Sequence, residues 1–263
     1  MKVYCVQLDQ AWEDKTANYA KAEQLLQQED PEPGSLVVLP EMFPTGYSIH
    51  IETTTAEEPE KTEVFLAGLA RKHNCWILSG NAEKRESPKG ANVSITFNPN
   101  GEKACGFTKL HPVPVYNEDK YYDKGMEIVT FPCNGFSISP FICYDLRFPE
   151  IFRIASFQGA DLLVIIANWP AVRINHWLTL LQARAIENQA YVVGVNRCGK
   201  DPNLEYPGRS AIFDPQGTCL VDAGGEETIV QAELNPETVR EWRKSFPALN
   251  DTRREFYNPQ WLS

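Results

Sequence analysis

Short apolar strands that alternate with helices constrain the fold of this chain more than any other feature. The longest apolar run, Leu162–Ala167, is far too short to span a membrane and is typical of a buried strand. Further strands are expected at residues 2–8, 35–39, 75–80, 91–98, 102–108, 128–132, 136–142 and 190–196, and helices at 15–28, from about residue 59, and at 175–188. This alternation predicts an α/β fold.

The expected helix at 175–188 carries apolar side chains around most of its circumference, including Trp177, Leu181 and Ile186. Asn175 is expected to cap its first turn. A helix that is apolar on more than one side is normally covered on more than one side, so it either lies between layers or packs against another subunit. The many strands and two sets of helices need at least three layers, and a helix–sheet–sheet–helix sandwich satisfies them.

Composition narrows the class of protein. The chain has 263 residues, 43% of them apolar, without repeats or linkers, so we expect one domain over residues 1–263. A net charge of −10 disfavours nonspecific binding to nucleic acid or to an anionic membrane. The first residues read as a strand rather than a secretion signal, and the seven cysteines form no paired framework, so free thiols in the cytoplasm are expected. No cysteine or histidine spacing is typical of a metal site.

Cys143 stands at the end of an apolar strand-like segment, and Pro149-Glu150 then opens a segment with helical spacing. This places a thiol at a strand-to-helix turn, where α/β enzymes carry their nucleophiles. Most cysteines are inert core residues, and Cys5, Cys75 and Cys219, which lie inside strand-like runs, fit that description.

A nucleophilic thiol needs a base or a positive environment. The four histidines are poorly placed, and only His111, which follows a lysine closely, is a candidate. Glu41 follows a buried strand, and Lys109 also follows a strand. Because the carboxyl ends of parallel strands meet at one crevice, we expect Glu41 and Lys109 to lie near Cys143.

Six segments in order resemble the nitrilase superfamily of carbon–nitrogen hydrolases: Leu39–Phe43, Lys109–His111, Cys143–Pro149, Ala167–Pro170, Gln182–Asn188 and Asp214–Gly217. The tyrosine and aspartate after Cys143 look like the omega-amidase branch, whereas true nitrilases usually carry tryptophan and glutamate there. The resemblance implies a four-layer α-β-β-α sandwich. It also implies hydrolysis of the terminal amide of a small carboxylate, such as 2-oxoglutaramate or 2-oxosuccinamate, with release of ammonia.

The resemblance further implies a role for each site residue. Glu41 would be the general base, Cys143 the nucleophile that forms a thioester, and Lys109 the cation that stabilises the oxyanion, with the backbone N–H of Tyr144 as second donor. Glu118 would orient Lys109 and the substrate amide, although a glutamate in a charged loop is otherwise expected to be solvated. No metal or organic cofactor is implied.

Substrate recognition depends on residues with competing interpretations. Arg147 and Arg173 are candidates for binding the substrate carboxylate, because arginine binds carboxylates in a bidentate manner. Arg147 could equally form a structural ion pair with a nearby acid, and Arg173 could be solvated. Phe43 and Trp169 are expected to wall the pocket, although aromatic residues at strand ends are more often core. The segment 112–116 departs from the family pattern, which leaves the substrate preference open.

Two other functions are compatible with the same residues. Glu41, Lys109 and Cys143, as a catalytic triad, could hydrolyse N-carbamoyl amino acids or hydrate nitriles. Alternatively, the chain could be a catalytically inactive interaction module. Small-molecule amide and water are the expected partners of an active enzyme, and a homodimer or higher homo-oligomer is the expected assembly.

Overall fold

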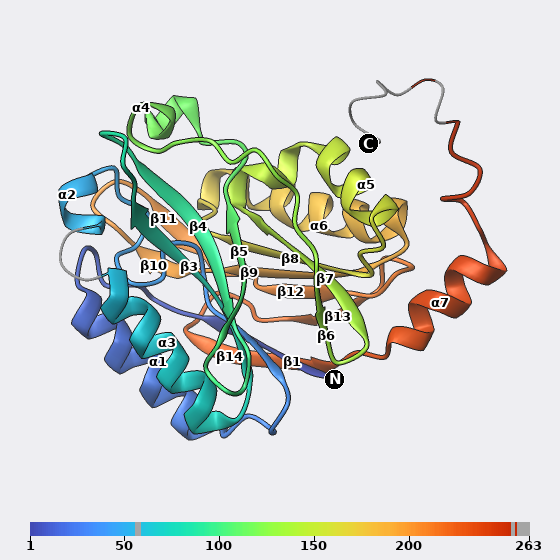
Figure 1. The fold of residues 1–263 in the computed structure, drawn as a ribbon, viewed down its shortest axis with the longest axis horizontal. Helices are drawn as coiled ribbons and strands as arrows, with labels where there is room; N and C mark the ends of the chain where they lie inside the picture. The colour runs from blue at the N-terminus through green and yellow to red at the C-terminus, as the bar shows by residue number, and fades with distance from the viewer. Residues whose placement is uncertain (56–58, 254–255, 257–263) are drawn as a thin grey trace.

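Two six-stranded sheets form the centre of the molecule (Figure 1). The computed structural model describes residues 1–55, 59–253 and 256. The first sheet has the order β14-β1-β2-β3-β4-β5, with strands β1 (Lys2–Gln7), β2 (Leu36–Val38), β3 (Trp76–Lys84), β4 (Gly90–Phe97), β5 (Lys103–Thr108) and β14 (Thr228–Glu233). Strands β1, β2 and β3 are parallel, and the other pairs are antiparallel.

The second sheet has the order β13-β12-β9-β8-β7-β6, with strands β6 (Phe131–Cys133), β7 (Phe136–Ile142), β8 (Leu162–Ala167), β9 (Tyr191–Asn196), β12 (Ala211–Phe213) and β13 (Cys219–Asp222). Strands β7, β8 and β9 are parallel. A separate hairpin consists of β10 (Cys198–Lys200) and β11 (Glu205–Pro207).

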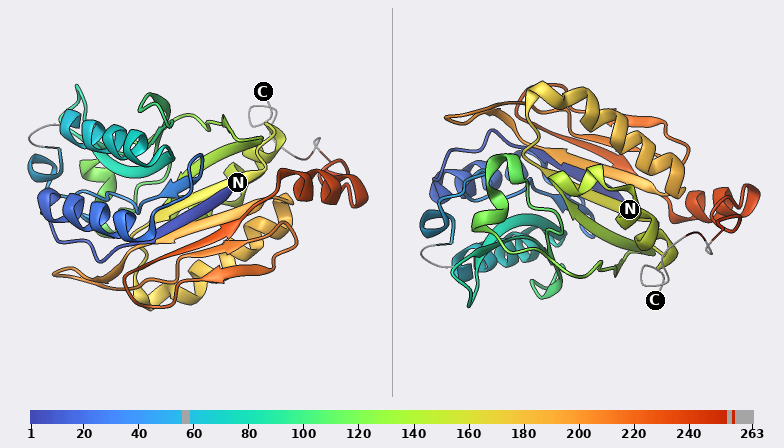
Figure 2. Two further views of the ribbon diagram at one scale, coloured as in Figure 1. Left: turned by 90° about the horizontal axis from the view of Figure 1, so that it is seen from below. Right: turned by 90° about the horizontal axis from the view of Figure 1, so that it is seen from above.

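Helices cover the outer faces of both sheets (Figure 2). Helices α1 (Lys15–Glu29) and α3 (Pro59–His73) lie on the first sheet, and α5 (Pro149–Phe157) and α6 (Ile174–Asn188) lie on the second. This confirms the α-β-β-α sandwich. The remaining helices are α2 (Ile51–Thr54), α4 (Glu118–Tyr121), α7 (Pro236–Ser245) and the 3-10 turns η1 (Pro114–Tyr116), η2 (Cys143–Arg147) and η3 (Ala171–Arg173).

Two apolar clusters hold these layers together. One joins residues of the first sheet, such as Val3 and Leu78, to the second sheet and its helices. The other joins the outer face of the first sheet to α1 and α3 through residues such as Leu26 and Leu66. Each fully buried side chain of this size stabilises the fold by roughly 1.5–3 kcal/mol, so the first cluster holds the two sheets together and the second holds α1 and α3 on the first sheet.

Two expected boundaries were wrong. The strand expected at 128–132 is found at Phe131–Cys133, because the chain just before it contacts β7 through a side chain, with Ser139 donating to the carbonyl of Val129. Helix α6 begins at Ile174, directly after the turn η3, so Asn175 lies inside the helix and is exposed rather than capping it.

Helix α6 is an outer layer (Figure 2), so the first of its two alternatives, a position between layers, is excluded. Trp177, Leu181 and Ala185 are buried against the second sheet, whereas the side of the helix that carries Ile186 faces outward, with Ile186 52% exposed. Cys219 was expected to be a core residue and is exposed instead, because β13 is the edge strand of its sheet. None of the helices in the described part of the chain is long and apolar enough to cross a bilayer.

Candidate active site

Glu41 lies just beyond the end of β2, in a turn that crosses over β3. The backbone of this turn bonds to β3, with Gly80 N–H donating to the carbonyl of Pro40 at 3.1 Å and Phe43 N–H donating to the carbonyl of Gly80 at 3.2 Å. A Cβ at Gly80 would lie 2.4 Å from the backbone nitrogen of Met42, so only glycine allows this approach. The turn leaves the Glu41 side chain fully buried.

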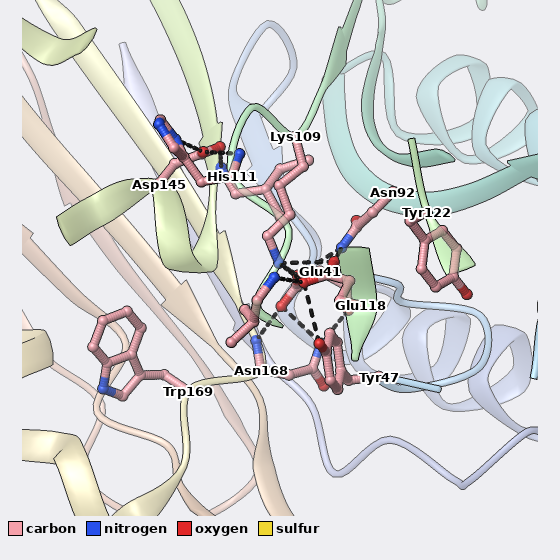
Figure 3. A network of polar contacts seen from close by, with 12 residues as sticks. Glu41, Tyr47, Asn92, Lys109, His111, Glu118, Tyr122, Asp145, Asn168 and Trp169 are labelled. Atoms are coloured by element: carbon pink, nitrogen blue, oxygen red, sulfur yellow. Dashed lines mark hydrogen bonds and ion pairs between the residues drawn. The ribbon is translucent and has the colours of Figure 1, made fainter. Parts of the chain in front are cut away.

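Lys109 follows the last residue of β5 and reaches Glu41 from the same edge of the sheet (Figure 3). Strands β5 and β2 run in the same direction, because β3 is parallel to β2 and antiparallel to β4, which in turn is antiparallel to β5. The Lys109 Nζ lies 2.8 Å from Glu41 Oε1 and 2.9 Å from Glu118 Oε2. All three side chains are fully buried.

Cys143 is the first residue after β7, at the start of η2. Its φ is +47°, a left-handed conformation that is uncommon for residues other than glycine and that often marks a functional turn. Asp145 fixes this turn: its carboxylate accepts hydrogen bonds from the backbone N–H of Ile142 at 3.1 Å and of His111 at 3.0 Å. It also lies 2.8 Å from the Nδ1 of His111, so this histidine pairs with Asp145.

The Cys143 thiol is close enough to Glu41, Lys109 and Glu118 for their charges to change its pKa. Burial and the charge of Glu41 raise the pKa of Cys143 well above its ordinary value, and Lys109 offsets them in part. Burial alone would lower the pKa of Lys109, but the carboxylates of Glu118 and Glu41 outweigh it and raise this pKa. At neutral pH the thiol is therefore protonated and the lysine is charged, so the thiol needs a base before it can attack.

Glu118 is buried at the start of α4, which excludes the alternative of a solvated side chain. Its carboxylate accepts hydrogen bonds from Lys109, from the hydroxyl of Tyr47 at 3.1 Å and from the backbone N–H of Val113 at 2.7 Å. Glu41 and Glu118 thus lie on either side of one ammonium group.

Sequence reasoning did not identify two asparagines that position these carboxylates. The Nδ2 of Asn92 donates to Glu41 Oε1 at 2.8 Å and to Glu118 Oε1 at 2.9 Å. The backbone N–H of Asn168 donates to Glu41 Oε2 at 2.8 Å. Asn92 interrupts the apolar strand β4, which is a usable signal, and Asn168 follows the buried strand β8.

Tyr47 was also missed, and its loop offers no pattern that would single it out. Its ring lies 5.5 Å from the Lys109 ammonium. Burial first, and then the charges of Glu118 and Glu41, raise the pKa of Tyr47, so its hydroxyl stays protonated and donates to Glu118.

A cavity of about 320 Å³ opens at Cys143. Of the residues expected to bind substrate, Tyr144, Arg147, Trp169 and Arg173 line it. Phe43 does not, and its expected place in the pocket wall was wrong. The ring of Phe43 packs in the apolar cluster under α1 and α3, 5.8 Å from the ring of Tyr19, because its turn directs this side chain to the outer face of the first sheet.

Both arginines of the cavity lack a carboxylate partner among the described residues. The Arg147 guanidinium lies 4.7 Å from the Trp169 ring centre and 3.3 Å from the Nδ1 of His176. Arg173 donates to the hydroxyl of Tyr116 and lies over its ring. The interpretation of Arg147 as half of a structural ion pair was therefore wrong, and Arg173 is half-buried rather than fully solvated.

The chain is similar to known proteins in sequence. Residues 2–244 match the family model described as carbon-nitrogen hydrolase. The 2-oxoglutaramate amidase of Bacillus subtilis is 34% identical over 97% of this chain and 98% of its own length. The omega-amidase YafV of Yersinia enterocolitica is 37% identical over 96% of each chain.

Solved structures are similar as well. The protein XC1258 of Xanthomonas campestris, described as a CN-hydrolase superfamily protein with an arsenic adduct in the active site, has a TM-score of 0.89 and 32% identity, covering 96% of this chain and 97% of its own. Nit3 of Saccharomyces cerevisiae, described as a member of branch 10 of the nitrilase superfamily, has a TM-score of 0.87 and 29% identity, covering 97% of each chain.

Proposed function

The chain belongs to the carbon–nitrogen hydrolase family, and we propose that it hydrolyses the terminal amide of a small carboxylate such as 2-oxoglutaramate or 2-oxosuccinamate. One observation carries this choice of substrate. Arg147 and Arg173 line the cavity at Cys143, and neither has a carboxylate partner among the described residues. In a chain with net charge −10, two such cations favour a substrate that brings its own carboxylate.

The first half of the reaction is acylation of Cys143. Glu41 takes the thiol proton, and the sulfur attacks the amide carbon to form the C–S bond. Glu41 then returns the proton to the nitrogen, the C–N bond breaks, and ammonia leaves. The raised pKa of Cys143 supports this order, because the thiol is protonated at rest and the charge of Glu41 is one of the causes of the shift.

The second half is hydrolysis of the thioester. Glu41 now takes a proton from water, the hydroxide attacks the acyl carbon, and the thiolate leaves and recovers the proton. In both halves Lys109 and the backbone N–H of Tyr144 stabilise the negative oxygen of the tetrahedral intermediate. A charged lysine in a fully buried site is suited to this role, since no water screens it.

Glu118 holds Lys109 in place and balances its charge when Glu41 becomes protonated. Without Glu118 the ammonium would keep only Glu41 as a carboxylate partner, and that partner is neutral for part of each cycle. Asn92 bridges the two carboxylates and keeps their separation constant. No step in this scheme needs a metal or an organic cofactor.

Ammonia release from purified protein tests the proposal. We expect 2-oxoglutaramate and 2-oxosuccinamate to be hydrolysed at least about tenfold more efficiently than pentanamide, which has no carboxylate for the arginines to bind. Arg147→Lys and Arg173→Lys keep the charge but lose the planar guanidinium, and each should raise KM for the carboxylate substrates more than for pentanamide.

Three outcomes would contradict the proposal. Faster hydrolysis of N-carbamoyl amino acids or of nitriles would assign the triad to a different reaction. Equal rates of hydrolysis for pentanamide and for the carboxylate substrates would show that Arg147 and Arg173 do not bind a substrate carboxylate. No turnover of any amide, together with no adduct at Cys143 by mass spectrometry, would favour an inactive interaction module.

The proposal extends to the assembly and the setting of the enzyme. A single hydrolase domain over residues 1–263 would act in the cytoplasm as a homodimer or larger homo-oligomer. Exposed Ile186 on the outer side of α6 supports pairing of two copies, because a partner would remove this apolar side chain from water. Ile186→Glu should lower the molar mass measured by light scattering, and an unchanged mass would argue against this surface.

A further inference from the structure

The side-chain carbonyl of Asn168 has no role in the scheme above. Asn168 is only 5% exposed and lines the cavity that contains Cys143. Its Nδ2 donates to the backbone carbonyl of Glu41 at 2.7 Å, whereas its Oδ1 has no hydrogen-bond partner among the described residues (Figure 3). A buried amide oxygen without a donor is unfavourable unless a ligand supplies one.

The orientation of this amide group is fixed by its neighbours. Turning it by half a rotation would bring Oδ1 against the carbonyl oxygen of Glu41, and two acceptors repel each other. The backbone around Asn168 is also held, because Asn196 accepts from the N–H of Trp169 at 2.7 Å and donates to its carbonyl at 3.0 Å. The oxygen therefore keeps pointing away from the backbone of Glu41.

We propose that Asn168 Oδ1 accepts a hydrogen bond from the leaving nitrogen of the amide substrate, which makes Asn168 a catalytic residue that selects amides over esters. This inference rests on the proposed amidase function. The leaving nitrogen must lie within hydrogen-bond reach of the Glu41 carboxyl group, which protonates it. The Asn168 amide contacts that same carboxyl group, with Nδ2 at 3.4 Å from Glu41 Oε2.

The hydrogen bond grows stronger as the reaction proceeds. In the bound amide the nitrogen is neutral and planar. When the C–S bond has formed and Glu41 delivers the proton, the nitrogen gains positive charge and its N–H groups become better donors. An acceptor placed there stabilises the transition state more than the bound substrate, so its loss should lower kcat/KM. An ester has a leaving oxygen without hydrogen, and Asn168 Oδ1 cannot assist it.

A matched pair of substrates separates this role from a structural one. The rate of Cys143 acylation would be measured by mass spectrometry in single turnovers with 2-oxoglutaramate and with the corresponding ω-methyl ester. In Asn168→Ala the amide-to-ester rate ratio should fall roughly ten- to hundredfold below that of the wild type. The hydroxyl of Asn168→Ser is too short to replace the amide, so this variant should show a similar fall in the rate ratio. It provides a second measurement in case Asn168→Ala misfolds.

Asn196→Ala is the control, because Asn196 supports the same loop without lining the cavity. It should slow both substrates by the same factor and leave the ratio unchanged. An unchanged ratio in both Asn168 variants would overturn this inference alone, since the wild type would still act on the amide. A wild type that is acylated by neither substrate would overturn the proposed function and this inference with it.

Discussion

Three fully buried ionisable side chains define the chemistry at the scale of single residues. Glu41, Lys109 and Glu118 carry a combined charge of −1 at neutral pH when all three are ionised. Removal of Lys109 would leave two buried carboxylates without their cation, and breaking a buried ion pair in this way costs about 3–5 kcal/mol. The same closeness of opposite charges allows Glu41 to act on Cys143 while Lys109 remains charged.

Cys143→Ala should abolish turnover and leave the fold intact. The substitution removes only the sulfur, which opens into the cavity, so little packing is lost. Ammonia release should fall to the background rate, and circular dichroism should give a wild-type spectrum. Cys219→Ala, at an exposed thiol, is the matched control and should retain full activity. Near wild-type turnover by Cys143→Ala would contradict the mechanism.

At the scale of elements, the site forms where the ends of β2, β5, β7 and β8 meet. Asp145 links two of these ends, because it bonds to Ile142 at the end of β7 and to His111 in the segment that follows β5. One carboxylate therefore holds both the turn that carries Cys143 and the segment that follows Lys109, without bonding to the side chain of either residue.

Asp145→Asn should lower kcat by about tenfold or more with little change in KM. Asparagine keeps the size of the side chain, but its NH₂ group would face a backbone N–H, of Ile142 or His111, that now donates to the carboxylate. Two donors repel each other, so the turn at Cys143 and the segment after β5 should shift. Steady-state kinetics with thermal melts would test this. Asp161→Asn is the control at the opposite end of β7, where Asp161 accepts from the N–H of Ser137. It should lower the melting temperature alone, and a similar result for Asp145→Asn would reduce Asp145 to a structural role.

Gly80→Ala should displace the turn that carries Glu41. The added methyl group would lie 2.4 Å from the backbone nitrogen of Met42, and backbone atoms cannot yield as a flexible side chain can. We expect a loss of about 1–3 kcal/mol in unfolding free energy and a marked fall in kcat. Gly68→Ala in α3 has no atom within 4 Å of the new Cβ, so it should be neutral or stabilising. Equal behaviour of the two variants would contradict the role of Gly80.

At the scale of the whole molecule, most of the cysteine thiols are buried. Burial raises the pKa of Cys75 to about 11, and burial is likewise the main reason that the pKa values of Cys133 and Cys198 rise to about 12. In the unfolded chain these thiols lose their protons at about pH 8.5. Above that pH the folded state therefore binds more protons than the unfolded state, and stability falls as pH rises.

The melting temperature should consequently decrease between pH 8.5 and 10.5. At lower pH these thiols are protonated in both the folded and the unfolded state, so they should not affect it. Cys133→Ala removes one of the groups and should make the decrease shallower. Differential scanning calorimetry across this range would measure both slopes. A wild-type curve that is flat above pH 8.5, or a variant with an unchanged slope, would contradict this source of alkaline sensitivity.

The sequence by itself determined most of the strands and helices up to residue 196 and the three candidate site residues Glu41, Lys109 and Cys143. Glu41, Lys109 and Cys143 could be predicted because each lies directly after a strand or within three residues of its end, and position after a strand is a local property of the chain. Strands β2 and β5 end at the same edge of the first sheet, whereas β7 belongs to the second sheet, so the packing of the two sheets was also needed to bring Cys143 to Glu41 and Lys109.

Only the tertiary structure decided which other side chains reach the site. Asn168 bonds to Glu41 across 127 positions of the chain, and no local pattern encodes that contact. Phe43 lies two residues from Glu41, yet its ring packs in the apolar cluster between the first sheet and helices α1 and α3, because the turn after β2 sets its direction. Whether Arg147 has a carboxylate partner depends on which acidic residues pack nearby. The packing of the two sheets decides where side chains point and which distant residues they contact. That packing depends on many weak contacts between residues from all parts of the chain.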